Sequence, residues 1–315
     1  MRRLEYLSPT SIDKFRESPE EFYVSYLADA KPPRPPQTQP MAVGSAFDAY
    51  VKSHLHAALG GIDPRFELDT LFEAQVEPHN RDWARAAGKH VFQSYNNAGA
   101  LAALLSELEQ GCNPNFEVEV SGVVESIPFL GRPDIHYTNR FGHTVLHDFK
   151  VNGYLGKRTT SPAPGYLQLR TTNGNKGAHP KASAILHKGV TLNLSHLLED
   201  VDPKWATQLS IYAWLVGVSI GGEFVAAIDQ LVCSPNGDQP TIRVAEHRTM
   251  VGAIFQRATL YDARMIWLRC QSGHFYPEVS LAESQEKCAL LDEQAKMLCQ
   301  PDGDREKYFA EVCRR

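Results

Sequence analysis

The stretch GRPDIHYTNRFGHTVLHDFKVN, residues 131–152, decides the fold because it has the pattern of a β-hairpin. The segments 132–138 and 143–151 alternate in polarity or are β-branched, as strands are. Residues 139–142 supply a four-residue turn between them. We therefore predict two antiparallel strands that lie side by side.

This hairpin sets two carboxylates and a lysine at one end. Residues two apart in a strand share a face, so Asp148 and Lys150 project together while Phe149 turns into the core. Pairing through the turn brings Asp134 near Asp148. Two adjacent carboxylates repel each other unless a cation lies between them or one is protonated, and Mg²⁺ takes such oxygen ligands. A lysine beside them can orient or deprotonate water, which outlines a site for phosphodiester hydrolysis.

A plainer reading of the same residues is an ion pair on a strand. The chain has a second D-x-K at Asp202-Pro203-Lys204, with no strand pattern around it. Charged residues on exposed strand faces are common. The hairpin alone therefore leaves both readings open, and its context has to decide between them.

The rest of the chain alternates helical and strand patterns. Apolar spacing predicts helices at 10–29 (two short ones), 41–59, 81–110, 203–218, 249–272 and 280–299. Further strands are predicted at 116–124, 223–233 and 240–248. This order predicts an α/β (α+β) core with a small central sheet flanked by helices and with an N-terminal helical cap.

We expect three parts along the chain. Residues 1–40 are a helical segment and a linker, whose KPPRPPQTQP run excludes helix and ladder alike. Residues 41–300 form the main domain, with an insertion at about 152–200, and 301–315 form a tail. The insertion is rich in Gly, Pro, Ser, Thr and Asn.

The insertion is basic although the protein is acidic overall. The chain carries a net charge of −5, yet it has no acidic residue from Phe149 to Leu198. A basic strip with aromatic residues is typical of nucleic-acid contacts. The candidate contacts are Lys157, Arg158, Arg170, Tyr154 and Tyr166. For the polar centre of the insertion, a solvated loop is the alternative.

Composition indicates an ordinary globular protein. Of its 315 residues, 43% are hydrophobic and 22% charged, and no apolar run approaches the length that spans a bilayer. We expect a cytoplasmic protein without a membrane partner. The six cysteines include no CxxC pair, so reduced thiols are the simplest interpretation.

Four motifs, taken in order, give the hairpin its context. They are SPTSIDKFRESPEEFYVSYL (8–27), GSAFDAYV (44–51), the GRPD and HDFK of the hairpin, and QLSIYAW (208–214). Together they resemble the PD-(D/E)XK nuclease superfamily, and in particular its RecB-like exonuclease branch. The resemblance implies the restriction-endonuclease-like fold of this superfamily, with a small mixed central sheet. It also implies a nuclease that depends on Mg²⁺ or Mn²⁺.

The resemblance also assigns roles. Asp48 stands where the family has a metal-binding histidine, and apart from this resemblance a solvated helix residue is the alternative reading. Metal ligands would be Asp48, Asp134, Asp148 and the Phe149 carbonyl. Lys150 would activate water. Gln208 and Tyr212, one helical turn apart, would contact the nucleic-acid strand.

The N-terminal motif has Ser18 where iron–sulfur members have a cluster cysteine, so no iron–sulfur cluster is expected. The expected activity is DNA hydrolysis, more as an exonuclease than as a site-specific endonuclease, in repair, recombination or phage or CRISPR-type processing. A non-catalytic DNA-binding subunit of a recombination or replication complex is the alternative, and an RNA-directed enzyme is a third reading. Expected partners are DNA, a second copy of the chain, or a recombination protein.

Overall fold

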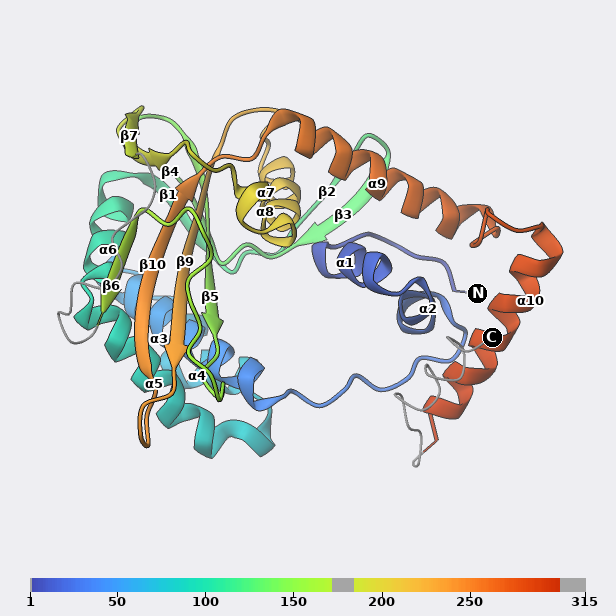
Figure 1. Cartoon of the computed structure of the whole chain (residues 1–315), viewed down its shortest axis with the longest axis horizontal. Coiled ribbons are helices and arrows are strands. Elements are labelled where there is room, and N and C mark those ends of the chain that lie inside the picture. Colours follow the sequence, from blue (N-terminus) through green and yellow to red (C-terminus); the bar gives the residue numbers. More distant parts are fainter. Residues whose placement is uncertain (1, 172–183, 301–315) are drawn as a thin grey trace.

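The structure is a computed structural model, which describes residues 2–171 and 184–300. The predicted tail at 301–315 and the centre of the insertion lie outside the described residues. The core is a mixed sheet of six strands in the order β1-β4-β5-β9-β10-β6, with helices on both faces (Figure 1). Its strands are β1 (Cys112–Phe116), β4 (Ile135–Thr138), β5 (Thr144–Asn152), β9 (Val225–Ser234), β10 (Thr241–Thr249) and β6 (Gln168–Thr171).

The predicted hairpin is formed by β4 and β5, which pair antiparallel with Ile135 opposite His147. Strand β5 then pairs in parallel with β9 along its whole length. Because β4 begins at Ile135, residues 148–152 of β5 extend past it and leave an open edge. This edge is where the polar end of the hairpin lies.

The strand predicted at 116–124 is wrong as a single element. Strand β1 ends at Phe116, and the next residue, Glu117, adopts a left-handed backbone conformation with φ of 49°. Strands β2 (Val120–Val124) and β3 (Ile127–Gly131) then form a separate hairpin. The alternation of Glu and Val hides this break, because nothing in the pattern marks Glu117 as a turn residue.

One face of the sheet is covered by α3 (Gln39–Ala58), α5 (Arg81–Asn97) and α6 (Ala100–Gln110). They enclose a core in which Phe47, Tyr95 and Phe149 pack edge to face. The helix predicted at 81–110 is therefore two helices, which meet at Gly99 with a φ of 78°. The short helix α4 (Leu68–Gln75) was not predicted, and single 3₁₀ turns flank it at Pro64–Phe66 and Pro78–Asn80.

The opposite face is covered by α8 (Pro203–Leu215), preceded by α7 (Leu198–Val201). Leu209 and Tyr212 of α8 pack on Leu146 of β5 and on β9. Asp202 caps α8, since its side chain accepts hydrogen bonds from the Lys204 and Trp205 amides. A two-stranded ribbon of β7 (Ala184–His187) and β8 (Val190–Asn193) completes the insertion.

A second core lies beyond α8, on the right in Figure 1. It joins the N-terminal helices to the C-terminal ones, and Ile211 and Trp214 of α8 also contribute to it. Its elements are α1 (Pro9–Glu17), α2 (Pro19–Phe22), a π-helical turn (Tyr23–Leu27), α9 (Ala253–Ser272) and α10 (Leu281–Leu298). The chain from 31 to 38 runs without helix or strand between the two cores, as the prolines predicted. The extension of this linker to residue 40 is wrong, because α3 begins at Gln39 with Pro40 in its first turn, where the missing N–H of proline breaks no helical hydrogen bond.

A glycine sets how closely α3 and α5 approach. A Cβ on Gly88 of α5 would lie 2.4 Å from the Cβ of Ala46 and 2.9 Å from its carbonyl carbon. We expect Gly88→Ala to lower the free energy of unfolding by about 1–3 kcal/mol, because backbone cannot yield as a side chain can. Urea unfolding measures this. Gly44→Ala on α3 is the control, since nothing lies within 4 Å of the added methyl and alanine should stabilise that helix by up to about 1 kcal/mol.

Candidate active site

The open edge of β5 brings together the three residues at the end of the hairpin. Asp134 precedes β4, and its Oδ2 accepts a hydrogen bond of 3.0 Å from the Phe149 amide. The Lys150 Nζ lies 2.5 Å from Asp148 Oδ2. The two acids therefore face each other across the hairpin, with Lys150 beside them.

A fourth and a fifth polar residue come from α8. Gln208 donates a hydrogen bond of 3.1 Å to Asp148 Oδ1 and accepts one of 3.0 Å from Lys150 Nζ. Its amide also donates to the Tyr212 hydroxyl at 3.2 Å. Gln208 thus orients both members of the D-x-K pair, and Tyr212 in turn holds Gln208. Tyr212 is largely buried, which raises its pKa to about 12.

On the other side of Asp134 lies a cluster of three carboxylates around one lysine. Lys52 Nζ is 2.6 Å from Asp48 Oδ2, 2.5 Å from Glu117 Oε1 and 3.0 Å from Asp134 Oδ1. Asp48 and Lys52 are one turn apart on α3, and Glu117 arrives from the left-handed turn after β1. The Lys52 side chain has no exposed surface.

Burial and charge shift the pKa values of these acids in opposite directions. Burial raises the pKa of Asp148 to about 6, the neighbouring Asp134 adds to this, and Lys150 opposes it. Burial would also raise the pKa of Asp134, but Lys52 and the Phe149 amide hold it below its usual value. For Asp48, burial outweighs Lys52 and the pKa is raised. The site therefore holds more carboxylates than its two lysines can balance.

Two cavities meet at this site. One of about 460 Å³ is lined by Asp48, Glu117, Asp134, Asp148 and Lys150, among others. A second, of about 890 Å³, shares Ala74, Glu117 and Arg132 with the first and extends to His56, Arg65 and Phe66. The two cavities adjoin at these shared residues, and together we call them the groove: the carboxylates line the first, and two arginines and a stacked His56–Phe66 pair line the second.

Only some of the residues predicted to contact nucleic acid are exposed near the site. Lys157 and Arg158 are exposed in the loop that leaves the site end of β5. Tyr154 packs edge to face on Trp83, away from the lining of both cavities. Tyr166 is only 5% exposed, so its ring offers no face to a base, and this corrects the prediction that it is available for stacking. Arg170 belongs to β6, which pairs with β10.

Two residues of the site were not predicted from the sequence. Glu117 lies within the strand predicted at 116–124, and Lys52 was given no role in the helix predicted at 41–59. The signal that could have found Lys52 is its place on the apolar stripe of α3, where it lies between Val51 and Leu55 in a helix packed on the core.

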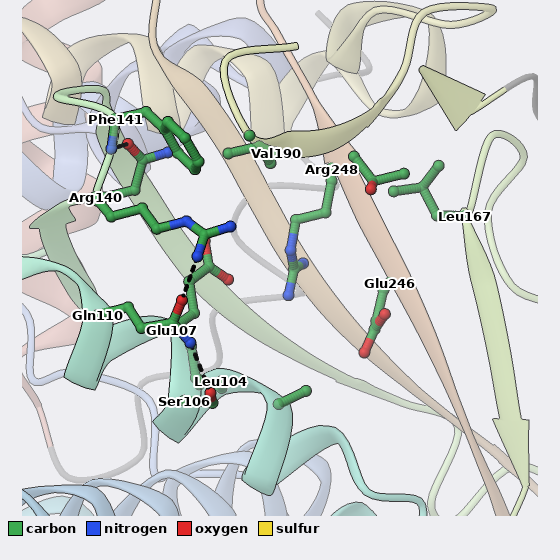
Figure 2. A pocket seen from close by; sticks show the side chains of 14 residues that line it. Leu104, Ser106, Glu107, Gln110, Arg140, Phe141, Leu167, Val190, Glu246 and Arg248 are labelled. Carbon is green, nitrogen blue, oxygen red and sulfur yellow. Dashed lines mark hydrogen bonds between the residues drawn. The ribbon is translucent and has the colours of Figure 1, made fainter. Parts of the chain in front are cut away.

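Another cavity, of about 730 Å³, lies at the opposite end of β5 (Figure 2). Arg140 in the β4–β5 turn donates to Gln110 of α6 at 2.9 Å and lies over the Phe141 ring. Arg248 of β10 lines it too and pairs with the buried Asp229, which the Tyr95 hydroxyl also contacts. Its lining has charges of both signs, and it is separate from the carboxylate cluster.

Comparison with known proteins gives the family. A model of the PD-(D/E)XK nuclease superfamily matches residues 6–171, which is just over half of the chain. The chain belongs to the PD-(D/E)XK nuclease superfamily. This confirms the superfamily and its fold, while the RecB-like branch stays a prediction, because the matched region ends before Gln208.

No curated protein matches this PD-(D/E)XK chain. A solved structure described as "Crystal structure of SSO0001" is similar to it at 13% identity and a TM-score of 0.25, over 82% of this chain and 84% of the other. No helix among the described residues is both long enough and apolar enough to cross a membrane.

PD-(D/E)XK nucleases use divalent metal ions, and the donor atoms here suit one. Oxygens of Asp48, Glu117 and Asp134 lie within 4.8 Å of one another. Asp48 Oδ1 is buried and accepts no hydrogen bond from the described residues. An all-oxygen set is the one preferred by hard ions such as Mg²⁺ and Mn²⁺.

Proposed function

We propose that this protein is a metal-dependent DNA nuclease that degrades strands from their ends. The observation that carries the proposal is the convergence of Asp134, Asp148 and Lys150 at the open edge of β5, beside the groove. Membership of the PD-(D/E)XK superfamily supports nuclease chemistry in general. The likeness of the Gln208–Tyr212 pair to the RecB-like motif supports an exonuclease. The all-oxygen donor set supports Mg²⁺ or Mn²⁺ as its ion.

In this proposal Asp134, Asp148 and the Phe149 carbonyl would hold the ion, with help from Asp48. The ion would stabilise negative charge that develops on the scissile phosphate. Burial would lower the pKa of Lys150, but Asp148 outweighs it and raises that pKa, so Lys150 stays an ammonium that would orient the attacking water and offset charge on the phosphate. The ion would lower the pKa of that water, whose proton would pass to solvent. Gln208 fixes Lys150 and Asp148 against each other, so their geometry is set before substrate arrives.

The groove gives the strand a path away from the scissile phosphate. Arg132 and Arg65 lie along it and can contact phosphates, while His56 and Phe66 can contact bases. Lys157 and Arg158 can contact the strand where it enters beside β5. Phosphate contacts of this kind bind without regard to sequence, which suits an exonuclease.

Cleavage assays on three forms of DNA test the function. We expect Mg²⁺ or Mn²⁺ to support degradation of linear DNA, EDTA to stop it, and covalently closed circles to survive. A nicked circle shows whether an internal end suffices, and a parallel assay with RNA tests the RNA-directed reading. Loss of circular and linear DNA at equal rates would contradict the exonuclease, and cleavage in EDTA would contradict the metal.

A second candidate is a non-catalytic DNA-binding subunit of a recombination or replication complex. The observation that favours it is Lys52 Nζ, a permanent cation among three of the carboxylates. Tight DNA binding that is indifferent to metal, with no cleavage of any substrate, is the result that would establish it.

A further inference from the structure

Lys52 lies where a metal ion would be expected. Its Nζ is within 3.0 Å of oxygens from Asp48, Glu117 and Asp134, the same three residues whose oxygens form a metal-type cluster. An ammonium group and a divalent ion seek the same carboxylate oxygens. Both cannot occupy the centre of one cluster.

The position of Lys52 is built into the fold rather than adopted on a surface. Its side chain has no exposed surface, and its three partners come from separate places: α3, the turn after β1 and the residue before β4. The ammonium between the three carboxylates offsets the repulsion among them. A buried charge with three such contacts is strongly held, since removing it leaves uncompensated anions.

We propose that Lys52 is a tethered cation that takes the place of a second divalent ion, so that the site binds one ion, between Asp134 and Asp148. Formal charge supports this. Among the described residues, the cations paired with Asp48, Glu117, Asp134 and Asp148 are Lys52 and Lys150, which leaves two formal negative charges in excess. One divalent ion balances them.

This inference rests on the proposed function in one respect, that the site takes up divalent ions at all. It adds the number of ions and the residue that sets it. Lys52 is a positioning residue here: it fixes Asp134 through Oδ1, while the Phe149 amide fixes the same carboxylate through Oδ2. Each oxygen of Asp134 therefore accepts one hydrogen bond, Oδ1 from Lys52 and Oδ2 from the Phe149 amide.

Counting bound Mn²⁺ on the full chain tests the proposal. Equilibrium dialysis, with electron paramagnetic resonance to measure free Mn²⁺, should give one ion per chain for the native protein and two for Lys52→Met. Methionine keeps the length of the side chain and removes the charge, so it opens the three-carboxylate cluster to an ion. Lys204→Met, on an exposed lysine paired with Glu17, is the matched control and should still bind one ion.

Lys52→Met could fail to fold in the absence of metal, because it leaves three carboxylates unpaired. Mn²⁺ should then raise its Tm more than it raises that of the native protein, since ions that bind only the folded state stabilise it. The double variant Lys52→Met with Glu117→Gln removes one charge of each sign, and we expect it to bind one ion again.

Two ions on the native protein, none on it, or an unchanged number on Lys52→Met would each overturn the proposal. The cleavage assays separate this outcome from the fate of the nuclease. If the protein binds one Mn²⁺ and cleaves no substrate, the inference about Lys52 stands and the proposed nuclease function is wrong. A protein that cuts DNA with two bound ions does the reverse.

Discussion

Lys150→Met should lower the rate of DNA cleavage by roughly 10³-fold, while the affinity for DNA changes little. The ammonium contacts Asp148 Oδ2 and Gln208 Oε1 at the open edge, where water and phosphate would meet. Methionine keeps the packing of the stem and removes the charge. Single-turnover cleavage of end-labelled linear DNA measures the rate, and DNA binding in Ca²⁺ measures affinity separately.

The chain provides its own control for this variant. Lys204 belongs to the second D-x-K, but its aspartate caps α8 and its amine is exposed beside Glu17. Lys204→Met should cleave at the native rate. Lys150→Arg should not restore activity, because a planar guanidinium cannot take the place of a compact ammonium. Native-like cleavage by Lys150→Met would exclude Lys150 from the chemistry.

Asp134→Asn should lower the rate of DNA cleavage to a similar extent, by about 10³-fold. The reason is geometric. Both oxygens of Asp134 accept hydrogen bonds, one from the Phe149 amide and one from Lys52 Nζ. An asparagine has one acceptor and one donor, so in either orientation its amide N–H faces another donor. The substitution therefore removes a proposed metal ligand and also disturbs both neighbours.

Cleavage and Mn²⁺ binding should fall together in Asp134→Asn. Asp238→Asn, in the exposed β9–β10 turn, is the matched control and should change neither. Thermal unfolding of the two variants checks that the fold is retained. If Asp134→Asn cut DNA at the native rate with a native metal requirement, the assignment of the carboxylate cluster would be wrong.

The hairpin at the centre of the fold could be predicted because its signals are local. A period of two, a four-residue turn and strand register place Asp134 opposite Asp148 without knowledge of any other element. Helices with a clear apolar stripe, such as α3 and α8, were predicted for the same reason. The hinge at Gly99 and the short α4 were missed, because alanine- and leucine-rich sequence continues smoothly through the first and α4 spans only two turns.

The remaining site residues depend on contacts that no local pattern records. Glu117 reaches the cluster only because β1 ends and the backbone turns left-handed there. Lys52 is buried because carboxylates from two other elements close over it. The basic and aromatic residues after β5 were visible in the sequence as a strip. Packing decides which of their side chains face the groove, as the positions of Tyr154 and Tyr166 show.

Helix α8 joins the two cores through two different faces. One face carries Gln208 and Tyr212 to the D-x-K pair, and the other places Ile211 and Trp214 among the outer helices. Arg16 of α1 also donates to Thr207, the neighbour of Gln208. We expect that a partner that displaced α1 would also shift Gln208, whose amide oxygen accepts the hydrogen bond from Lys150. Helix α8 thus connects the outer helices to the amine that is proposed to act in cleavage.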